Sequence, residues 1–296
     1  MPKLPALAGR FVAVLLTVLI TGCGAGTLDG EVEAAGEPGD PGVIHVHGIG
    51  VAPDGGSLYV ATHTGLFTIE DGTARRVGDR YHDLMGFTIA GPDDFLASGH
   101  PDLNDQTLLK PEAPPLLGLV ASDDGQDWQP VSLLGEVDFH SLQAAHGQVY
   151  GYDSTSSRFM VSENRETWES RSRLPLIDFV VSPDDPDLIV GSTDRIVRST
   201  DGGRTWQPMG IKPLVAVAWD QDGPVGVAPD GTVLKADATG QDWQPMGSLG
   251  GSPEALQAHD GTLYAWVTDH GLLTSSDGGA TWTIRYAVGK NSARSS

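Results

Sequence analysis

STDGGRTW, at residues 199–206, recurs with few changes as SSDGGATW at residues 275–282. Three weaker copies end at Trp128, Trp168 and Trp243, so the five tryptophans that close these segments are 40, 38, 37 and 39 residues apart. A fixed period of this length indicates a repeat architecture, in which each repeat is one supersecondary unit that buries its apolar face against its neighbours. One repeated unit should therefore build most of the chain.

The sequence between these segments is typical of short β-strands. Apolar runs such as 187–191 and 195–199 are separated by turns rich in Asp, Gly and Pro. Each period holds four such runs, which is the content of one propeller blade. Residues 48–77 form a first unit without the tryptophan segment. Together with the five units that end in a tryptophan segment it makes six units of about 41 residues, which fill residues 43–287. We therefore predict an all-β fold, a six-bladed β-propeller with Asp, Gly and Trp in its repeated turns, as one domain over residues 43–296.

The first 22 residues have the features of an export signal. Two basic residues give a positive start, and the apolar run 11–20 is too short to span a bilayer. The run ends in LITGC, which resembles the bacterial lipobox, whose cysteine becomes lipidated. We expect residues 1–22 to be a signal peptide, and Cys23 to anchor the protein by acyl chains on the extracytoplasmic face of the cell membrane. Residues 23–42, rich in Gly, Pro and acidic residues, should form a flexible tether.

The charge balance excludes one class of partner. The chain has 39 acidic and 18 basic residues and a formal net charge of −21, whereas nucleic-acid-binding proteins concentrate Lys and Arg on one face. We therefore expect no nucleic-acid partner. With one cysteine in the sequence, the chain cannot form an internal disulfide.

Several histidines fall at equivalent positions of the predicted blades. The innermost strand of a blade and its second strand run antiparallel, so the start of the first and the end of the second lie at the same mouth of the central channel. The expected innermost strands begin, in blade order, with His47, Met85, His140, Asp178, Val215 and Glu254. The second strands of the first two blades end with His63 and His100. Four imidazoles should therefore converge at one mouth, unless they are unrelated turn residues.

This convergence would suit a transition metal. Imidazole binds zinc, copper, iron and nickel, and a methionine sulfur favours copper. We expect one ion, copper or zinc, with the ligands His47, His63, His100 and His140 and with Met85 as a fifth. The neighbouring side chains expected to orient these ligands are His45, Asp83 and Asp138.

The repeated segment resembles the Asp-box, or BNR, repeat, S-x-D-x-G-x-T-W. In that family the box is the turn between the third and fourth strands of a propeller blade, where the Asp holds the turn backbone and the Trp packs between blades. The resemblance implies structural roles for Asp123, Asp201, Asp277, Trp128, Trp168, Trp206, Trp243 and Trp282. It implies no chemistry for these residues.

From His45 onward the chain is similar to bacterial exported Asp-box proteins that are often labelled glycosyl hydrolase or exo-α-sialidase-like. HVHGIG, YVATHTGLF, DLMGF, ASGHP and EVDFH carry this resemblance together with the boxes. It implies a sialidase-like propeller. Sialidases, however, hold the substrate carboxylate with three arginines, and no arginine begins an expected innermost strand of this chain.

Two alternatives to a metal-binding propeller stay open. A glycoside hydrolase would use two carboxylates about 5 to 10 Å apart, for which the candidates are Asp138, Asp178 and Glu254. A binding platform would use the same mouth to hold a peptide or a partner protein. The residues alone do not decide between a small molecule, a glycan and a protein as the ligand.

We predict that Cys23→Ser releases the protein from the membrane or leaves it uncleaved, because the substitution removes the thiol that would be acylated. Membrane fractionation and the mass of the mature N-terminus measure this. Processing and fractionation unchanged from the wild type would contradict the predicted anchor.

Overall fold

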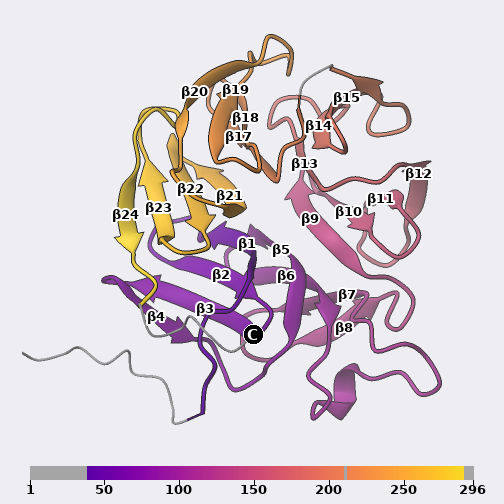
Figure 1. Ribbon diagram of the computed structural model, residues 1–296. Coiled ribbons are helices and arrows are strands. Elements are labelled where there is room, and N and C mark those ends of the chain that lie inside the picture. The colour runs from indigo at the N-terminus through magenta and orange to yellow at the C-terminus, as the bar shows by residue number, and fades with distance from the viewer. Residues whose placement is uncertain (1–38, 210–211, 290–296) are drawn as a thin grey trace, which may run out of the picture. The chain divides into compact units, whose positions relative to one another are not determined.

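The repeated units fold as six four-stranded antiparallel sheets arranged around a central channel (Figure 1). The computed structural model describes residues 39–209 and 212–289. In every sheet the four strands are consecutive in the chain, which confirms the predicted all-β, six-bladed β-propeller. Within the described ranges the one helical element is η1 (Gln106–Leu108), and no helix there has the length and apolar character needed to cross a membrane.

Each blade contributes four strands. Those of the first two blades are β1 (Val46–Val51), β2 (Leu58–Thr62), β3 (Gly65–Glu70), β4 (Thr73–Arg76), β5 (Asp83–Gly91), β6 (Asp94–His100), β7 (Leu119–Ser122) and β8 (Gln129–Ser132). Those of the third and fourth are β9 (Phe139–Ala145), β10 (Gln148–Asp153), β11 (Arg158–Ser162), β12 (Glu169–Arg173), β13 (Asp178–Val181), β14 (Leu188–Ser192), β15 (Ile196–Thr200) and β16 (Gln207–Pro208). Those of the last two are β17 (Ala216–Asp220), β18 (Gly223–Val227), β19 (Thr232–Lys235), β20 (Gln244–Ser248), β21 (Pro253–His259), β22 (Thr262–Val267), β23 (Gly271–Ser275) and β24 (Thr283–Tyr286).

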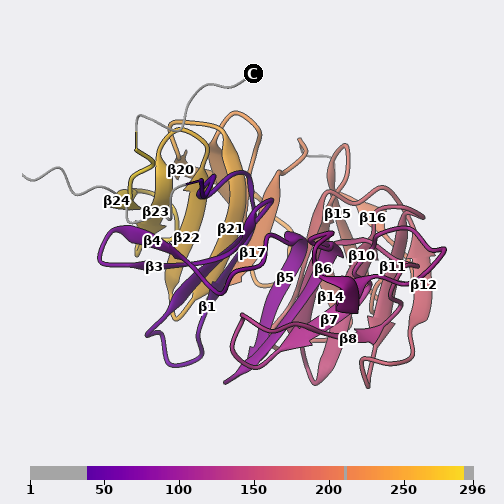
Figure 2. The same ribbon diagram turned by 90° about the horizontal axis from the view of Figure 1, so that it is seen from below.

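The first strand of each blade lies innermost and lines the channel. These strands are β1, β5, β9, β13, β17 and β21. They lie nearest the centre of the ring in Figure 1, and the side view shows the strands running along the channel direction (Figure 2). The starts of all six innermost strands therefore open on one mouth of the channel.

The turn between the third and fourth strands of a blade is held by one side chain. In the fourth blade Asp201 accepts hydrogen bonds from the backbone N–H groups of Arg204 (3.1 Å) and Thr205 (2.8 Å), and from the Thr205 hydroxyl (2.6 Å). Ser199 Oγ donates to Asp201 at 2.8 Å and accepts from the Gly203 N–H at 2.9 Å. A short carboxylate two residues after a serine therefore satisfies the polar groups of the turn.

The same pattern recurs in other blades, with asparagine in place of aspartate in one of them. Asp277 repeats the bonds in the sixth blade, and Asn164 takes the equivalent position in the third. In the second blade the carboxylate that accepts the turn N–H groups is that of Asp124 rather than the expected Asp123. The reason is spacing, because the carboxylate must follow the serine, here Ser122, by two residues to face those N–H groups.

The box tryptophans lie between adjacent blades. Trp206 of the fourth blade packs edge-on against Phe159 of the third, with ring centroids 5.5 Å apart, and its Nε1 donates to Ser172 Oγ at 2.9 Å. The other four lie in apolar clusters formed by their own blade and the preceding one: Trp128, Trp168, Trp243 and Trp282. Because each blade covers the apolar face of its neighbour, these clusters hold the ring together.

The ring closes between the sixth and first blades without a shared strand. β21 to β24 and β1 to β4 form separate sheets. The apolar cluster between them contains Trp266, which stacks on Tyr286 with ring centroids 5.6 Å apart. Glu254 Oε2 also accepts a hydrogen bond from the Val46 N–H at 2.7 Å. The first blade has no box tryptophan, so Trp266 and Tyr286 supply the aromatic surface at this seam.

The last residues of the predicted tether contact the first blade. The predicted signal peptide, Cys23 and most of the predicted tether lie outside the described residues. The end of that tether is bound to the first blade, since Asp40 pairs with Arg76 and the Gly42 carbonyl accepts from the Thr64 hydroxyl at 2.6 Å. Residues 40–42 therefore contact the first blade, although they precede its first strand.

We predict that the double substitution Asp201→Asn and Asp277→Asn reduces the loss of stability in acid. In each case the hydroxyl and backbone N–H of a following threonine lower the pKa of the carboxyl from 3.8 to about 2. Such a group contributes stability above about pH 4 that is lost as the pH falls toward 2. Asparagine keeps the acceptor oxygen, as Asn164 does, but does not titrate.

Urea unfolding of the wild type and the double variant at several values between about pH 2 and pH 7 measures this difference. Between about pH 4 and pH 2 the wild type should lose more stability than the double variant, so the gap between the two curves should narrow in acid. Parallel curves over the whole range would show that the box carboxylates do not contribute to acid sensitivity.

Candidate metal centre

Four of the six innermost strands carry one extra residue at the channel mouth. In β1 the residues on either side of His47 pair with consecutive residues of β2, so His47 has no opposite residue. The extra residues of the other three strands are Met85, His140 and Glu254. A bulge of this kind changes the direction of a side chain. All four residues line the channel cavity, which has a volume of about 600 Å³.

His63 and His100 reach the same mouth from the second strands. His63 directly follows β2, and His100 is the last residue of β6, where it pairs with Asp83 of β5. The close approach of these two strands requires Gly99, whose φ is +129° and where a Cβ would lie 2.1 Å from the Asp83 carbonyl oxygen. Glycine at position 99 thus allows His100 to lie beside Asp83.

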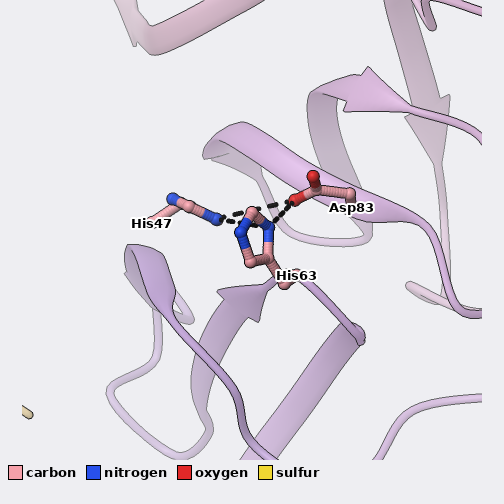
Figure 3. Close-up of side chains that lie close together, drawn as sticks. All are labelled: His47, His63 and Asp83. Carbon is pink, nitrogen blue, oxygen red and sulfur yellow. Dashed lines mark hydrogen bonds and ion pairs between the residues drawn. The ribbon is translucent and has the colours of Figure 1, made fainter. Parts of the chain in front are cut away.

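His47, His63 and Asp83 bring three ligand atoms together from two adjacent blades (Figure 3). His63 Nδ1 lies 2.6 Å from Asp83 Oδ1 and 3.1 Å from His47 Nε2. The remaining separation, from His47 Nε2 to Asp83 Oδ1, is 3.5 Å. The His63 side chain is 42% exposed, so solvent reaches the cluster from that side.

His63 Nδ1 faces both Asp83 Oδ1 and His47 Nε2, so one proton on His63 Nδ1 has two possible acceptors. When His63 Nδ1 donates its proton to Asp83, His47 Nε2 faces the same N–H as a second acceptor. A cation would instead accept a lone pair from each atom. Atoms at these separations lie on a circle of radius about 1.8 Å. This radius is shorter than zinc–nitrogen and zinc–oxygen bonds, which are roughly 2.0–2.2 Å long. An ion placed slightly above their plane can therefore reach all three.

His47 is neutral at ordinary pH. Burial is the main cause that lowers its pKa, and the nearby imidazoles of His63, His140 and His45 lower it further, while the charge of Asp83 opposes them. The result is a pKa of about 4 instead of 6.5. Neutral imidazole is the form that binds metals, so His47 does not need to lose a proton before it can act as a ligand.

His100 and His140 belong to a second part of the mouth, centred on Asp138. Asp138 Oδ2 lies 2.9 Å from His140 Nε2 and 3.8 Å from His100 Nε2, while His100 Nδ1 lies 3.4 Å from Asp83 Oδ2. Burial alone would raise the pKa of Asp138, but the hydrogen bond and charge of His140, the charge of His100 and the Ser154 hydroxyl together lower it. Asp83 thus connects the two parts of the mouth, one through each carboxylate oxygen.

Met85 and His45, the other two residues expected at this site, lie at its edges. Met85 lines the channel cavity. The exposed ring of His45 packs edge-on against His63, with centroids 5.2 Å apart. Neither is among the three residues whose ligand atoms cluster within 4.8 Å.

Asp178 and Glu254, two of the three candidate catalytic carboxylates, bind neighbouring blades. Asp178 accepts from Ser141 Oγ of the third blade (2.7 Å) and from the Val217 N–H of the fifth (2.9 Å). Burial raises its pKa to about 6. Glu254 accepts from Val46 N–H across the seam and from the Thr268 hydroxyl at 2.9 Å. Their oxygens are therefore engaged in holding the ring.

Asp83 is expected from the sequence to orient the ligands, but its Oδ1 lies within the group of three potential ligand atoms. The bulges that bring His47, Met85 and His140 into the mouth were also not foreseen. A sequence signal for Asp83 did exist, because it lies two residues before Met85 and so on the same side of an extended strand.

Three solved structures with different descriptions are similar to this chain. One is a chain of the nidogen–laminin complex, with 11% identity, a TM-score of 0.57 and coverage of 74% of this chain and 88% of that one. An ancestral GH74 enzyme has 13% identity, a TM-score of 0.55 and coverage of 85% and 40%, so this chain spans less than half of it. Virginiamycin B lyase from Staphylococcus aureus has 13% identity, a TM-score of 0.57 and coverage of 84% and 86%.

Identities this low show the fold alone. No protein-family model and no curated protein sequence matches the chain. The function must therefore be argued from the residues at the channel mouth.

We predict that His47 titrates near pH 4 in the metal-free protein, and that Asp83→Asn moves this midpoint lower because it removes the charge that favours the imidazolium. Imidazole chemical shifts followed by NMR over pH 3 to 8 measure both midpoints. A midpoint near the ordinary value of about 6.5 would mean that His47 is not desolvated as the structure describes.

Proposed function

We propose that this protein is an exported, lipid-anchored Asp-box propeller that binds one transition-metal ion at a channel mouth. The observation that carries the proposal is the group of ligand atoms from His47, His63 and Asp83, all within 4.8 Å of one another. Two imidazoles and a carboxylate form a donor set that is common for zinc. Zinc is therefore the first candidate, and copper is the second because the nearby Met85 would favour it.

The arrangement leaves space for a further ligand. Three protein ligands with one open position are the usual composition of a catalytic zinc site. The open position could take His100, His140, water or a substrate that enters the cavity of about 600 Å³. Metal-assisted hydrolysis and metal delivery both fit such a site.

The charge distribution in the channel supports this proposal over a sialidase-like activity. Among the described residues that line the cavity, none is Lys or Arg, so an anionic sugar would meet no side-chain cation there. Two of the three candidate acids, Asp178 and Glu254, are engaged between blades. The hydrolase label of similar proteins thus has less support in this channel than metal binding has.

The anchoring part of the proposal rests on residues 1–23. The apolar run, the small residues after it and the single cysteine coincide at Cys23. Acyl chains on Cys23 would be the membrane contact of an otherwise strongly acidic protein.

We predict that His63→Ala weakens zinc binding by more than the roughly 10–100-fold that loss of an outer-shell residue causes, because it removes one of three ligands. Titration of metal-free protein with Zn²⁺, and separately with Cu⁺, measures the affinity. The control is His146→Asn at the other end of β9, where the histidine ring contacts the Ser182 carbonyl at 2.7 Å.

The control should bind metal like the wild type. Equal binding by His63→Ala and the wild type would contradict the proposed site, and so would the absence of measurable zinc or copper binding by the wild type.

A further inference from the structure

The chain before β1 crosses the first blade at the channel mouth that holds the metal centre. Residues 40–45 run from the outermost strand of the blade, where Asp40 binds Arg76, to the start of the innermost strand. Between these points they contact the turn that follows β2. This turn carries His63, one of the three proposed ligands.

The backbone of His63 is held by this segment. The His63 N–H is shared between the carbonyl oxygens of Ile44 (3.1 Å) and His45 (3.2 Å). The next residue, Thr64, donates its hydroxyl to the Gly42 carbonyl at 2.6 Å. Three residues of the N-terminal segment thus accept hydrogen bonds from the His63 N–H and from the side chain of the next residue.

Arg76 joins the segment to the same turn. Its guanidinium donates to both carboxylate oxygens of Asp40, with Nε 2.9 Å from Oδ2, and its Nη1 donates to the Thr64 carbonyl. The Arg76 and Asp40 side chains are only 9% and 11% exposed. The guanidinium also lies over the rings of Phe67 and Tyr81, 4.5 and 4.0 Å from their centroids. A bidentate, partly desolvated pair of this kind fixes geometry as well as charge.

We propose that Arg76 is a positioning residue for the metal centre, and that attachment of residues 40–45 to the first blade is coupled to metal binding. The inference rests on the proposed function, since it concerns the same ion. Arg76 holds the Thr64 carbonyl and, through Asp40, the segment that accepts the His63 N–H. Loss of this support would let the turn move and would take His63 Nδ1 away from His47 and Asp83.

The coupling must act in both directions. If attachment of the segment raises metal affinity, then bound metal strengthens attachment of the segment by the same factor. Detachment of residues 40–45 would therefore lower the metal affinity of the channel mouth, and loss of the metal would weaken the attachment of these residues.

The test compares Arg76→Gln and Asp40→Asn with Arg75→Gln, which removes the neighbouring, exposed arginine of the same strand. The metal-free proteins are titrated with Zn²⁺. Affinity should fall by roughly 10–100-fold in the first two variants, as for other outer-shell residues, and should stay at the wild-type value in Arg75→Gln. Circular dichroism shows whether each variant is folded, and Asp40→Asn, which lies outside every strand, keeps the test usable if Arg76→Gln does not fold.

Two further readouts separate a positioning role from a structural one. Co²⁺ in place of Zn²⁺ should show weaker visible absorption in Asp40→Asn, because loss of His63 as a ligand moves the ion from four-coordinate toward six-coordinate geometry. Zn²⁺ should slow hydrogen exchange of the His63 N–H in the wild type but not in His47→Ala.

The outcomes distinguish the two proposals. If the wild type and Arg75→Gln bind metal, and Arg76→Gln and Asp40→Asn bind it equally well with the same Co²⁺ spectrum, the positioning role is wrong and the metal site stands. If the wild type binds no metal, the proposed function fails first and the inference fails with it.

Discussion

The structure depends on the burial of an apolar face between each pair of neighbouring blades. A single four-stranded sheet cannot cover its own apolar side, and in this chain five of the six interfaces receive a box tryptophan to fill the space. The sixth, at the seam, uses Trp266 and Tyr286 instead. The ring is therefore a closed series of similar contacts, in which every innermost strand packs against two neighbouring innermost strands.

Carboxylates perform three different tasks in this ring, and their hydrogen-bond donors distinguish them. Asp201 is surrounded by backbone N–H and hydroxyl donors of one turn. Asp178 accepts from the Ser141 hydroxyl of the preceding blade and from the Val217 N–H of the following blade. The hydrogen bonds of the Asp83 carboxylate in the described chain come from imidazoles only. A carboxylate whose partners can give up their protons is the one of the three that is suited to a cation.

The fold followed from the sequence because a tryptophan period near 38 residues is compatible with few architectures. The convergence of histidines could be predicted in part from the sequence, because the start of an innermost strand and the end of the second strand lie at the same mouth of the channel. The bulge at His47 was not predictable, since a one-residue change of register leaves no mark in a strand of six residues. The ion pair of Arg76 with Asp40 was also not predictable from the sequence. It joins residues 36 positions apart, one in the loop before β1 and the other in the outermost strand of the blade.

The attachment of residues 40–45 to the first blade by the Arg76–Asp40 ion pair has a mechanical consequence. The first and sixth blades form separate sheets, so a pull transmitted directly to β1 would act on the apolar cluster and on the Glu254 hydrogen bond that join these blades. Asp40 precedes β1 and is fastened to the last residue of β4, whose backbone is paired with β3. Tension applied at the N-terminus therefore loads the Arg76 ion pair and the edge of the first sheet before it reaches the seam.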